Sequence, residues 1–410
     1  MMYQYFKDMA TGIEAKISQD PDLPNPRKRY ALETARLGSR IYSGKDTVAW
    51  CGVAVPYDLL NAMGITSCFV EFVGAALAIT GMAEPFLEEA EQAGFGGDTC
   101  GFHRTVIGAA RKQIMPEPDF LIASTCPCSG GIAIMENLAR IFNKELFVLN
   151  VPQADEPQNV RYLADQLKGM VEFISRHTGK PLDRERLRQS VECTNEASAI
   201  MKEAYRLAQQ IPSPTNGSLL INFGIVWPLF MGTPAAIEIA QAYLDEFSAR
   251  IKSGSPGVPD EKLRLLWIQN RIQFDNPLVD LLEKEYQANI VSDELNDIYW
   301  DPIDPDDPYT GMARRAITIP FNGKVQDRIK HLQKLARAYK LDGAINPCNW
   351  GCRQGTGARG LISDGLKEIG VPVLNLEVDC VDKRNFAEGQ LRTRLEAFFE
   401  MLESRPRPLH

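Results

Sequence analysis

The hydrophobic pattern changes its period near residue 46, and this change divides the chain into regions of different predicted structure. In residues 1–45 apolar residues recur at helical spacing, which predicts helices only. Beyond this point, short apolar runs of strand length alternate with amphipathic helical stretches. The strands predicted in this region cover residues 47–51, 66–72, 119–124 and 146–151.

The same alternation returns after a long helical stretch. Residues 156–260 predict helices at 160–176, 184–209 and 235–251, an apolar buried segment at 219–231, and a Gly/Ser/Pro-rich linker at 253–259. Strands are then expected at residues 263–268, 316–319, 343–346 and 371–376, with helices between most of them.

Strands that alternate with helices indicate parallel sheets covered by helices on both faces. We therefore predict an α/β fold with two Rossmann- or flavodoxin-like parallel-sheet domains, plus helical N-terminal and linking segments. The expected divisions are N-terminal helices at 1–45, a first α/β domain at 46–155, a helical segment at 156–260 and a second α/β domain at 261–410. A chain of 410 residues is too long for one hydrophobic core, which agrees with this division.

Composition and charge argue against some classes of binding partner and location. The net charge of −8 argues against nucleic acid or an anionic membrane as the main partner. The N-terminus lacks the pattern of a signal peptide, and the longest apolar run is too short to span a membrane. We expect a soluble, cytoplasmic protein.

Nine cysteines are the most informative feature of the composition. An odd number fits poorly with complete disulfide pairing, and in a reducing compartment clustered cysteines suggest metal or redox chemistry. Most of them follow predicted strands. Cysteines at or just beyond the carboxyl end of a predicted strand are Cys51, Cys126, Cys128, Cys348, Cys352 and Cys380.

Ligands of open α/β sheets bind beyond the carboxyl ends of the strands, so these cysteines lie where chemistry is expected. Cys100 lies in a Gly-rich loop directly before a predicted helix. Helix N-termini present free N–H groups and a positive dipole end, which we expect to lower the pKa of nearby thiols and to favour anionic sulfur clusters.

Three interpretations of the cysteines stay open at this stage. Thiolates are the ligands of iron–sulfur clusters. Cys126, Cys128, Cys348 and Cys352 are also sufficient for a four-cysteine zinc site, although such sites usually lie in small modules. Otherwise the thiols are simply buried. Cys51 is undecided between ligand and packing, whereas Cys68 and Cys193 are expected to be packing residues.

The C-terminal part carries a family resemblance. It contains the segments NPCNWGCRQ at 346–354, LEVDCVD at 376–382 and EGQLRTR at 388–394, and the first α/β unit contains VPYDLLNAMG at 55–64. These segments resemble those of 2-hydroxyacyl-CoA dehydratase and benzoyl-CoA reductase subunits, over nearly the whole chain. The chain departs from the usual acidic pair after the first-motif proline, where it has Tyr57 and Asp58.

The resemblance implies a cofactor. Family members hold one 4Fe-4S cluster with three cysteines, which match Cys100, Cys352 and one of Cys126 and Cys128. This chain adds the second cysteine of that pair, Cys348 and Cys380. The resulting set of six resembles the double-cubane cluster proteins of the superfamily, in which six cysteines hold an 8Fe-9S cluster.

For such proteins the resemblance further implies a homodimer, an ATP-hydrolysing 4Fe-4S reductase of the activator type as electron donor, and reduction of small molecules at low potential. The chain itself has no evident ATP-binding motif. The glycine motif at 355–360 fits a dinucleotide fingerprint, but intervening loop residues separate it from its strand, and we favour a turn beside the cluster.

His103 and Glu377 are the candidate proton donors. His103 follows Cys100 by three residues, and Glu377 lies close to Cys380; packing or capping roles are the alternatives. Three functions are therefore carried forward: a double-cubane reductase, a dehydratase or aryl-CoA reductase subunit with a single 4Fe-4S cluster, and a non-catalytic electron carrier or scaffold.

Overall fold

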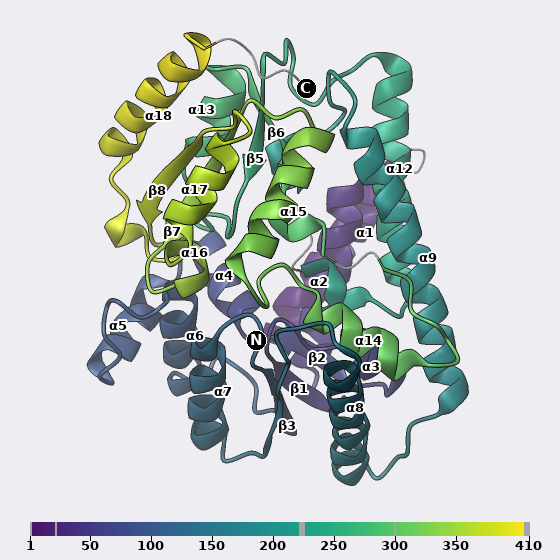
Figure 1. Cartoon of the computed structure of the whole chain (residues 1–410). Helices are drawn as coiled ribbons and strands as arrows, with labels where there is room; N and C mark the ends of the chain where they lie inside the picture. The colour runs from purple at the N-terminus through teal and green to yellow at the C-terminus, as the bar shows by residue number, and fades with distance from the viewer. Residues whose placement is uncertain (1, 21–22, 221–225, 299–300, 406–410) are drawn as a thin grey trace.

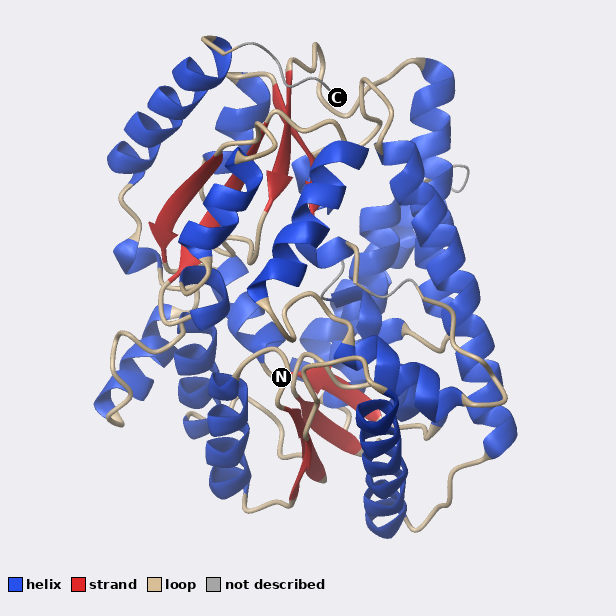
Figure 2. Ribbon diagram, in the orientation of Figure 1, coloured by secondary structure: helices blue, strands red, loops and turns tan. Residues whose placement is uncertain are grey.

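The computed structural model describes residues 2–20, 23–220, 226–298 and 301–405. Two four-stranded parallel sheets lie in separate units, each flanked by helices, and long helices run alongside both (Figures 1 and 2). This arrangement confirms the predicted α/β class with two Rossmann- or flavodoxin-like units.

The first sheet has the strand order β2-β1-β3-β4. Its strands are β1 (Val48–Cys51), β2 (Thr66–Phe69), β3 (Phe120–Ser124) and β4 (Leu146–Leu149). The helices of this unit are α3 (Tyr57–Ala62), α4 (Glu71–Ile79), α5 (Glu84–Gln92), α6 (Gly101–Arg111) and α7 (Ser129–Phe142). Because β1 and β3 are buried on both faces, they form short, mostly apolar runs instead of alternating patterns, whereas β2 is equally buried but begins with Thr66 and Ser67.

The second sheet repeats the arrangement, with the order β6-β5-β7-β8. Its strands are β5 (Leu263–Trp267), β6 (Ala288–Asp293), β7 (Gly343–Asn349) and β8 (Val373–Val378). The helices that accompany it are α13 (Leu278–Lys284), α15 (Val325–Ala338), α16 (Arg353–Thr356), α17 (Arg359–Lys367) and α18 (Glu388–Glu403). In each sheet the strand order reverses between the two central strands, which is where α/β folds bind ligands.

Long helices make up the rest of the chain. They are α1 (Met2–Gln19), α2 (Pro26–Ile41), α8 (Pro157–Thr178), α9 (Arg184–Ala208) and α12 (Pro234–Ser253). Asp183 caps α9 by accepting hydrogen bonds from the N–H groups of Glu185 and Arg186. Of the predicted buried segment 219–231, residues 221–225 lie outside the described residues, and Trp227–Phe230 is a buried 3₁₀ turn.

Several elements differ from the prediction. The strand predicted at 66–72 ends at Phe69, and α4 begins at Glu71. The strand predicted at 316–319 is wrong, because these residues end and follow helix α14 (Pro308–Ile317), which begins with a proline at its first position. Strand β6 was not predicted, and β7 extends further than predicted, so that Cys348 lies inside this strand and not after it.

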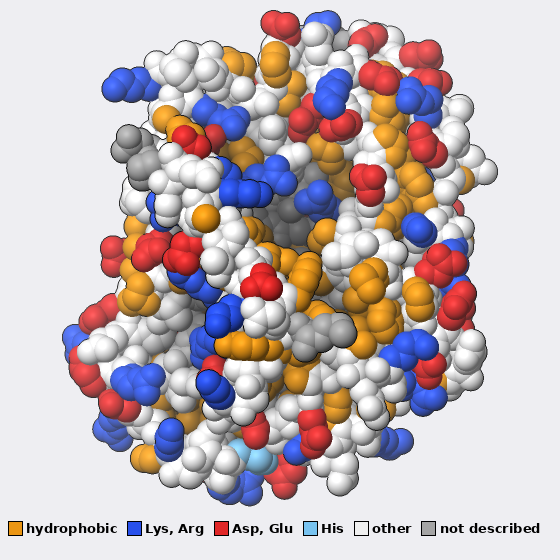
Figure 3. Space-filling model, turned by 180° about the vertical axis from the view of Figure 1, so that it is seen from behind, with side chains coloured by type: hydrophobic (Ala, Val, Ile, Leu, Met, Phe, Trp, Pro, Cys, Tyr) orange, Lys and Arg blue, Asp and Glu red, His pale blue; other side chains and the backbone are white. Residues whose placement is uncertain are grey.

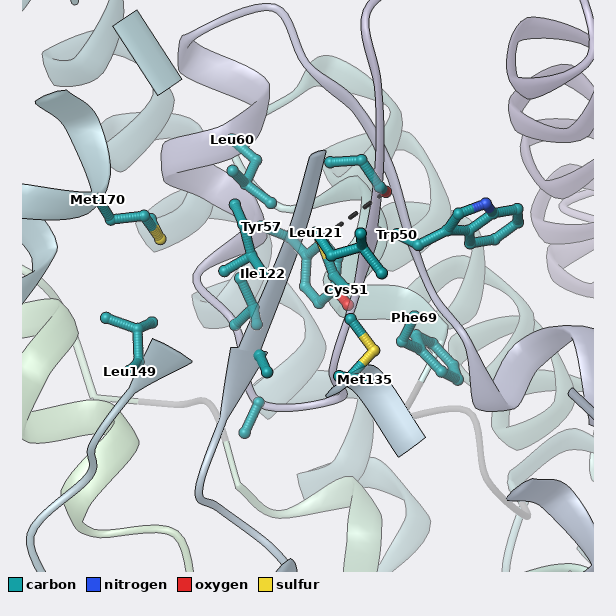
Figure 4. Packing of buried hydrophobic residues seen from close by; sticks show 14 of the residues in the cluster. Trp50, Cys51, Tyr57, Leu60, Phe69, Leu121, Ile122, Met135, Leu149 and Met170 are labelled. Atoms are coloured by element: carbon teal, nitrogen blue, oxygen red, sulfur yellow. Dashed lines mark hydrogen bonds between the residues drawn. The ribbon is translucent and has the colours of Figure 1, made fainter. Parts of the chain in front are cut away.

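Cys51 lies in the hydrophobic core of the first unit. Its side chain is fully buried in the cluster around Trp50, Phe69 and Met135 (Figure 4). Cys68 is buried in the same core, and Cys193 is half-buried on α9. These positions fit packing roles for the three cysteines. Within the described part of the chain, no helix is long and apolar enough to cross a membrane.

Candidate functional site

A cavity of about 1110 Å³ lies where the two α/β units face each other. The loops after all four central strands contribute to its wall. These contributions are Val53 and Ala54 after β1, Cys126–Cys128 after β3, Gln269–Arg271 and Gln273 after β5, and Gly351–Gln354 after β7. Both sheets thus direct the loops at their switch points toward one shared space.

Four of the six predicted ligands line this cavity, and they come from both units. They are Cys100, Cys126, Cys128 and Cys352. Three of them occupy N-cap positions: Cys100 precedes α6, Cys128 precedes α7 and Cys352 precedes α16. The Cys128 sulfur accepts a hydrogen bond from the N–H of Gly131 at 3.4 Å. The cavity therefore combines thiols with the N–H groups of helix N-termini.

Contacts between the units hold these cysteines in place. The Asn349 side chain donates a hydrogen bond from Nδ2 to the Cys100 sulfur at 3.6 Å, and its Oδ1 accepts one from the N–H of Cys380 at 2.7 Å. Gly351 has a φ of 70°, and a Cβ at this position would overlap the backbone nitrogen of Cys100. Only glycine allows the loops that carry Cys100 and Cys352 to approach this closely.

A buried ionic network makes a second connection between the units. Arg104 on α6 is 1% exposed, and it donates to Asp379 at 3.0 Å and to Asp382 at 3.3 Å, both in the loop after β8. It also donates to the carbonyl oxygen of Thr99 and to Glu91. Arg104 thereby joins the helix that begins after Cys100 to the loop that contains Cys380.

Cys380 and Cys348 do not belong to the lining. The Cys380 thiol is fully buried, contacts the Asn270 carbonyl oxygen at 3.8 Å, and is close enough to Cys100 and Cys352 for their charges to act on it. The Cys348 thiol is buried within β7, 3.5 Å from Oδ1 of Asn375. Over the described residues, no group of three or more His, Cys, Asp and Glu side chains is arranged around a single metal ion.

Burial controls the protonation of these thiols. It raises the pKa of Cys126 to about 12 and that of Cys128 to about 11, and it raises the pKa values of Cys100, Cys352 and Cys380 as well. Hydrogen bonds from backbone N–H groups lower the pKa of Cys100, Cys128 and Cys352, but the effect of burial is larger and each pKa remains raised. The expected lowering by helix N-termini is therefore outweighed, and thiolates here require a further positive charge.

The two candidate proton donors are in different surroundings. His103 is buried in the cavity wall, and its Nε2 lies 3.3 Å from Oε1 of Glu71, another lining residue. The second carboxyl oxygen of Glu71 is buried and has no hydrogen-bond partner among the described residues. Glu377, in contrast, is largely exposed, pairs with Arg359, and is not part of the lining.

Comparison with known proteins identifies the family. The family model for the 2-hydroxyglutaryl-CoA dehydratase D-component matches residues 52–402. The chain belongs to this family. The match includes the second sheet, strands β2, β3 and β4 of the first sheet, all six predicted cysteine ligands and His103.

Relatives in the 2-hydroxyglutaryl-CoA dehydratase D-component family are similar along most of their length. The chain is 24% identical to the (R)-phenyllactyl-CoA dehydratase alpha subunit of Clostridium sporogenes, over 91% of this chain and 92% of the relative. It is 23% identical to the alpha subunit of lactoyl-CoA dehydratase of Anaerotignum propionicum, over 88% and 91%. It is 24% identical to one of the benzoyl-CoA reductase subunits of Thauera aromatica, over 77% and 79%. The family is thus one of dehydratase and reductase subunits.

Sequence reasoning did not find Glu71, Asn349 or Arg104. Glu71 directly follows the carboxyl end of β2, so the rule that found the cysteines applied to it, but the predicted strand extended through it. Asn349 belongs to the segment 346–354, which carries the family resemblance, but no role was predicted for it. Arg104 has no local signal in the sequence, because the buried carboxylates that it contacts after β8 are distant in sequence.

Proposed function

We propose that this chain is an iron–sulfur reductase that holds a double-cubane 8Fe-9S cluster between its two α/β units and reduces small molecules there. The observation that carries the proposal is the set of thiols from both units around one cavity, with Cys100, Cys126, Cys128 and Cys352 in the lining and Cys380 close to two of them. The cluster, when bound, would supply low-potential electrons to a substrate in the cavity.

The donor set fits such a group. Iron supplies the positive charge that buried thiolates need. The Asn349 side chain and the Gly131 N–H already point at sulfur atoms, as hydrogen bonds to cluster ligands do. Cys126 and Cys128 are separated by one residue, which suits two neighbouring cubanes better than one. Cys348 completes the proposed set of six only if its side chain turns from Asn375 toward the cavity.

The chain's own acid–base pair would handle protons. His103 and Glu71 lie within 3.3 Å of each other in the wall beside Cys128; His103 is buried and Glu71 is partly buried. A proton on this pair can pass to a substrate anion as it forms. Glu377 is not included in this role, because its carboxylate faces Arg359 at the surface.

The electron source would be a separate protein. No ATP-binding motif is evident in the sequence. We propose an ATP-hydrolysing 4Fe-4S reductase as the donor and a homodimer of this chain as the active form, both of which follow from the resemblance to double-cubane proteins.

A second function is favoured by the position of Cys348. Its burial in β7, outside the lining, leaves fewer thiols at the cavity than two cubanes require. A single 4Fe-4S cluster on Cys100, Cys352 and one of Cys126 and Cys128 would make the chain a 2-hydroxyacyl-CoA dehydratase or aryl-CoA reductase subunit. Relatives with such names support this second candidate.

Metal analysis distinguishes the candidates. The chain is purified without oxygen, and iron and acid-labile sulfide are counted per chain. About eight irons support the double-cubane cluster and about four support the single cluster. Reduction of a small substrate with a low-potential donor then separates an enzyme from a non-catalytic carrier. A preparation free of iron contradicts both functions.

A further inference from the structure

The cavity continues from the cysteines to a second group of residues that the proposed function does not use. Arg27 and Tyr30 of α2, Tyr243 of α12 and Arg271 of the loop after β5 line this part. Arg27 is exposed and Arg271 is half-buried. Figure 3 shows the face opposite to that of Figure 1; it is hollowed near its middle, with basic side chains beside the hollow.

Neither arginine pairs with a carboxylate in the part of the chain that the structure describes. Among the residues that the structure describes, neither guanidinium group has an ion pair or a side-chain hydrogen bond. Glu71 and Asp98 are the carboxylates among the described lining residues, and neither pairs with these arginines; Glu71 instead contacts His103. This contrasts with Arg104, Arg264, Arg315 and Arg328, the well-buried arginines of this chain, each of which contacts a carboxylate.

Placing two like charges here costs stability. Burial and the neighbouring charge of Arg27 lower the pKa of Arg271. Arg27, Lys28 and Arg29 occupy the first turn of α2, where the helix dipole disfavours cations, and this turn contains no acidic residue. An uncompensated arrangement of this kind is expected where the missing negative charge belongs to a ligand.

The loop that carries Arg271 also contacts the cysteine site. Asn270, its neighbour, lines the cavity, and its carbonyl oxygen contacts the Cys380 thiol. The N–H of Gln273 donates to the carbonyl oxygen of Cys380 at 2.8 Å. Several aromatic side chains also belong to the same lining: Phe69, Phe72, Phe95, Phe102 and Phe321.

We infer that Arg27 and Arg271 form an anion subsite, which binds the carboxylate or phosphate group of a substrate whose apolar body extends toward the cysteines. This inference rests on the proposed function for the identity of the reacting end only. The charged end is recognised by the arginine pair whether or not a cluster is bound. A carboxylate would come from a free acid, and a phosphate from a phosphorylated carrier such as coenzyme A.

Calorimetric titration of the full-length, anaerobically purified protein tests the subsite. The probes are 3-phenylpropionate, its neutral analogue 3-phenylpropanamide, inorganic phosphate and coenzyme A. A carboxylate or phosphate probe should bind at least about tenfold more tightly than the amide. Binding by 3-phenylpropionate alone identifies a free acid, whereas binding by phosphate or coenzyme A identifies a phosphorylated carrier. Weak binding of all the anions, or equal binding of acid and amide, overturns the inference.

Variants locate the binding site. Arg271→Gln should weaken binding of the anion by about tenfold or more, and Arg271→Lys should restore most of it. Lys28→Gln, in the same turn as Arg27 but outside the lining, removes the same charge and should change the affinity less than about twofold. Equal losses in Arg271→Gln and Lys28→Gln would mean a general field effect and overturn the subsite.

Iron analysis of the same preparations separates the two proposals. If iron is absent but binding still depends on Arg271, the proposed function fails and the subsite stands. If iron is present and binding ignores the charge of the probe, the subsite alone fails. The melting temperature of each variant confirms that it is folded.

Discussion

Replacement of Arg104 by glutamine tests how much the buried ion pairs between the two units contribute to stability. The guanidinium group is 1% exposed, and its partners Asp379 and Asp382 are 0% and 2% exposed. Glutamine cannot supply the charge, so Asp379 would remain buried without a cationic partner, whereas Asp382 would keep its ion pair with Arg384. Removing one partner of a buried ion pair costs about 3–5 kcal/mol. We expect a loss of this size in the free energy of unfolding of Arg104→Gln.

The loss should depend on pH in a defined direction. Burial raises the pKa of Asp379 even in the intact protein, and the Arg104 charge opposes this rise. Without Arg104 the pKa of Asp379 rises further. A carboxyl group whose pKa is higher in the folded than in the unfolded state destabilises the fold at high pH, and this effect disappears as the pH falls through the folded-state pKa. The destabilisation of Arg104→Gln should therefore be largest near pH 8 and smaller near pH 6.

Urea denaturation followed by tryptophan fluorescence measures these differences. Arg111→Gln is the matched control, because Arg111 lies on the same helix and pairs with Glu89 at the surface. Adding Asp379→Asn to Arg104→Gln should recover part of the loss, since asparagine still accepts from the N–H groups of Val381 and Asp382. Equal effects of Arg104→Gln and Arg111→Gln at both pH values would refute the reasoning.

Three further predictions concern the cavity. Gly351→Ala should abolish iron binding, because its Cβ would overlap the backbone of Cys100. Gly389→Ala is the control and should retain the iron content of the parent, because a Cβ at this position meets nothing within 4 Å. Similar iron contents in the two variants would contradict the proposed close approach of the loops. Asn349→Asp removes the hydrogen-bond donor to the Cys100 sulfur but keeps the acceptor for the Cys380 N–H. The midpoint potential of the cluster, measured in an EPR-monitored redox titration, should therefore become more negative. An unchanged potential would exclude this hydrogen bond from the cluster's surroundings. Glu71→Gln should keep the iron content but lower substrate reduction about 100-fold or more, and a rate within twofold of the parent would remove the His103–Glu71 pair from proton transfer.

The sequence predicted the fold class because parallel strands that are buried on both faces leave short apolar runs between amphipathic helices. Strand β6 was not predicted, because it does not form such an apolar run. Its Asn289 is buried and polar, and its side chain bonds to the Thr215 carbonyl oxygen and to Glu261, residues far away in sequence. The false strand at 316–319 arose for the opposite reason, since its apolar, β-branched residues pack as the end of helix α14 against the first unit.

The site was predictable in part for a similar reason. Cysteines after strands, and Cys100 directly before a helix, reveal their location through topology, and Cys100, Cys126, Cys128 and Cys352 do line one cavity. What topology does not give is the direction of a side chain. Cys348 and Glu377 were assigned by proximity to strand ends, yet Cys348 is held inside β7 and Glu377 faces solvent. Arg27 and Arg271 come together only through tertiary packing, without a local signal in either segment.

The central claim is that thiolates of both units hold one shared iron–sulfur centre. An iron anomalous-difference map from crystals grown without oxygen tests it most directly. The account predicts iron in the cavity between Cys100 and Cys128 of the first unit and Cys352 of the second, bonded to sulfurs of both. Iron bound by cysteines of one unit only, or a cavity without iron in a preparation protected from oxygen throughout, would contradict it.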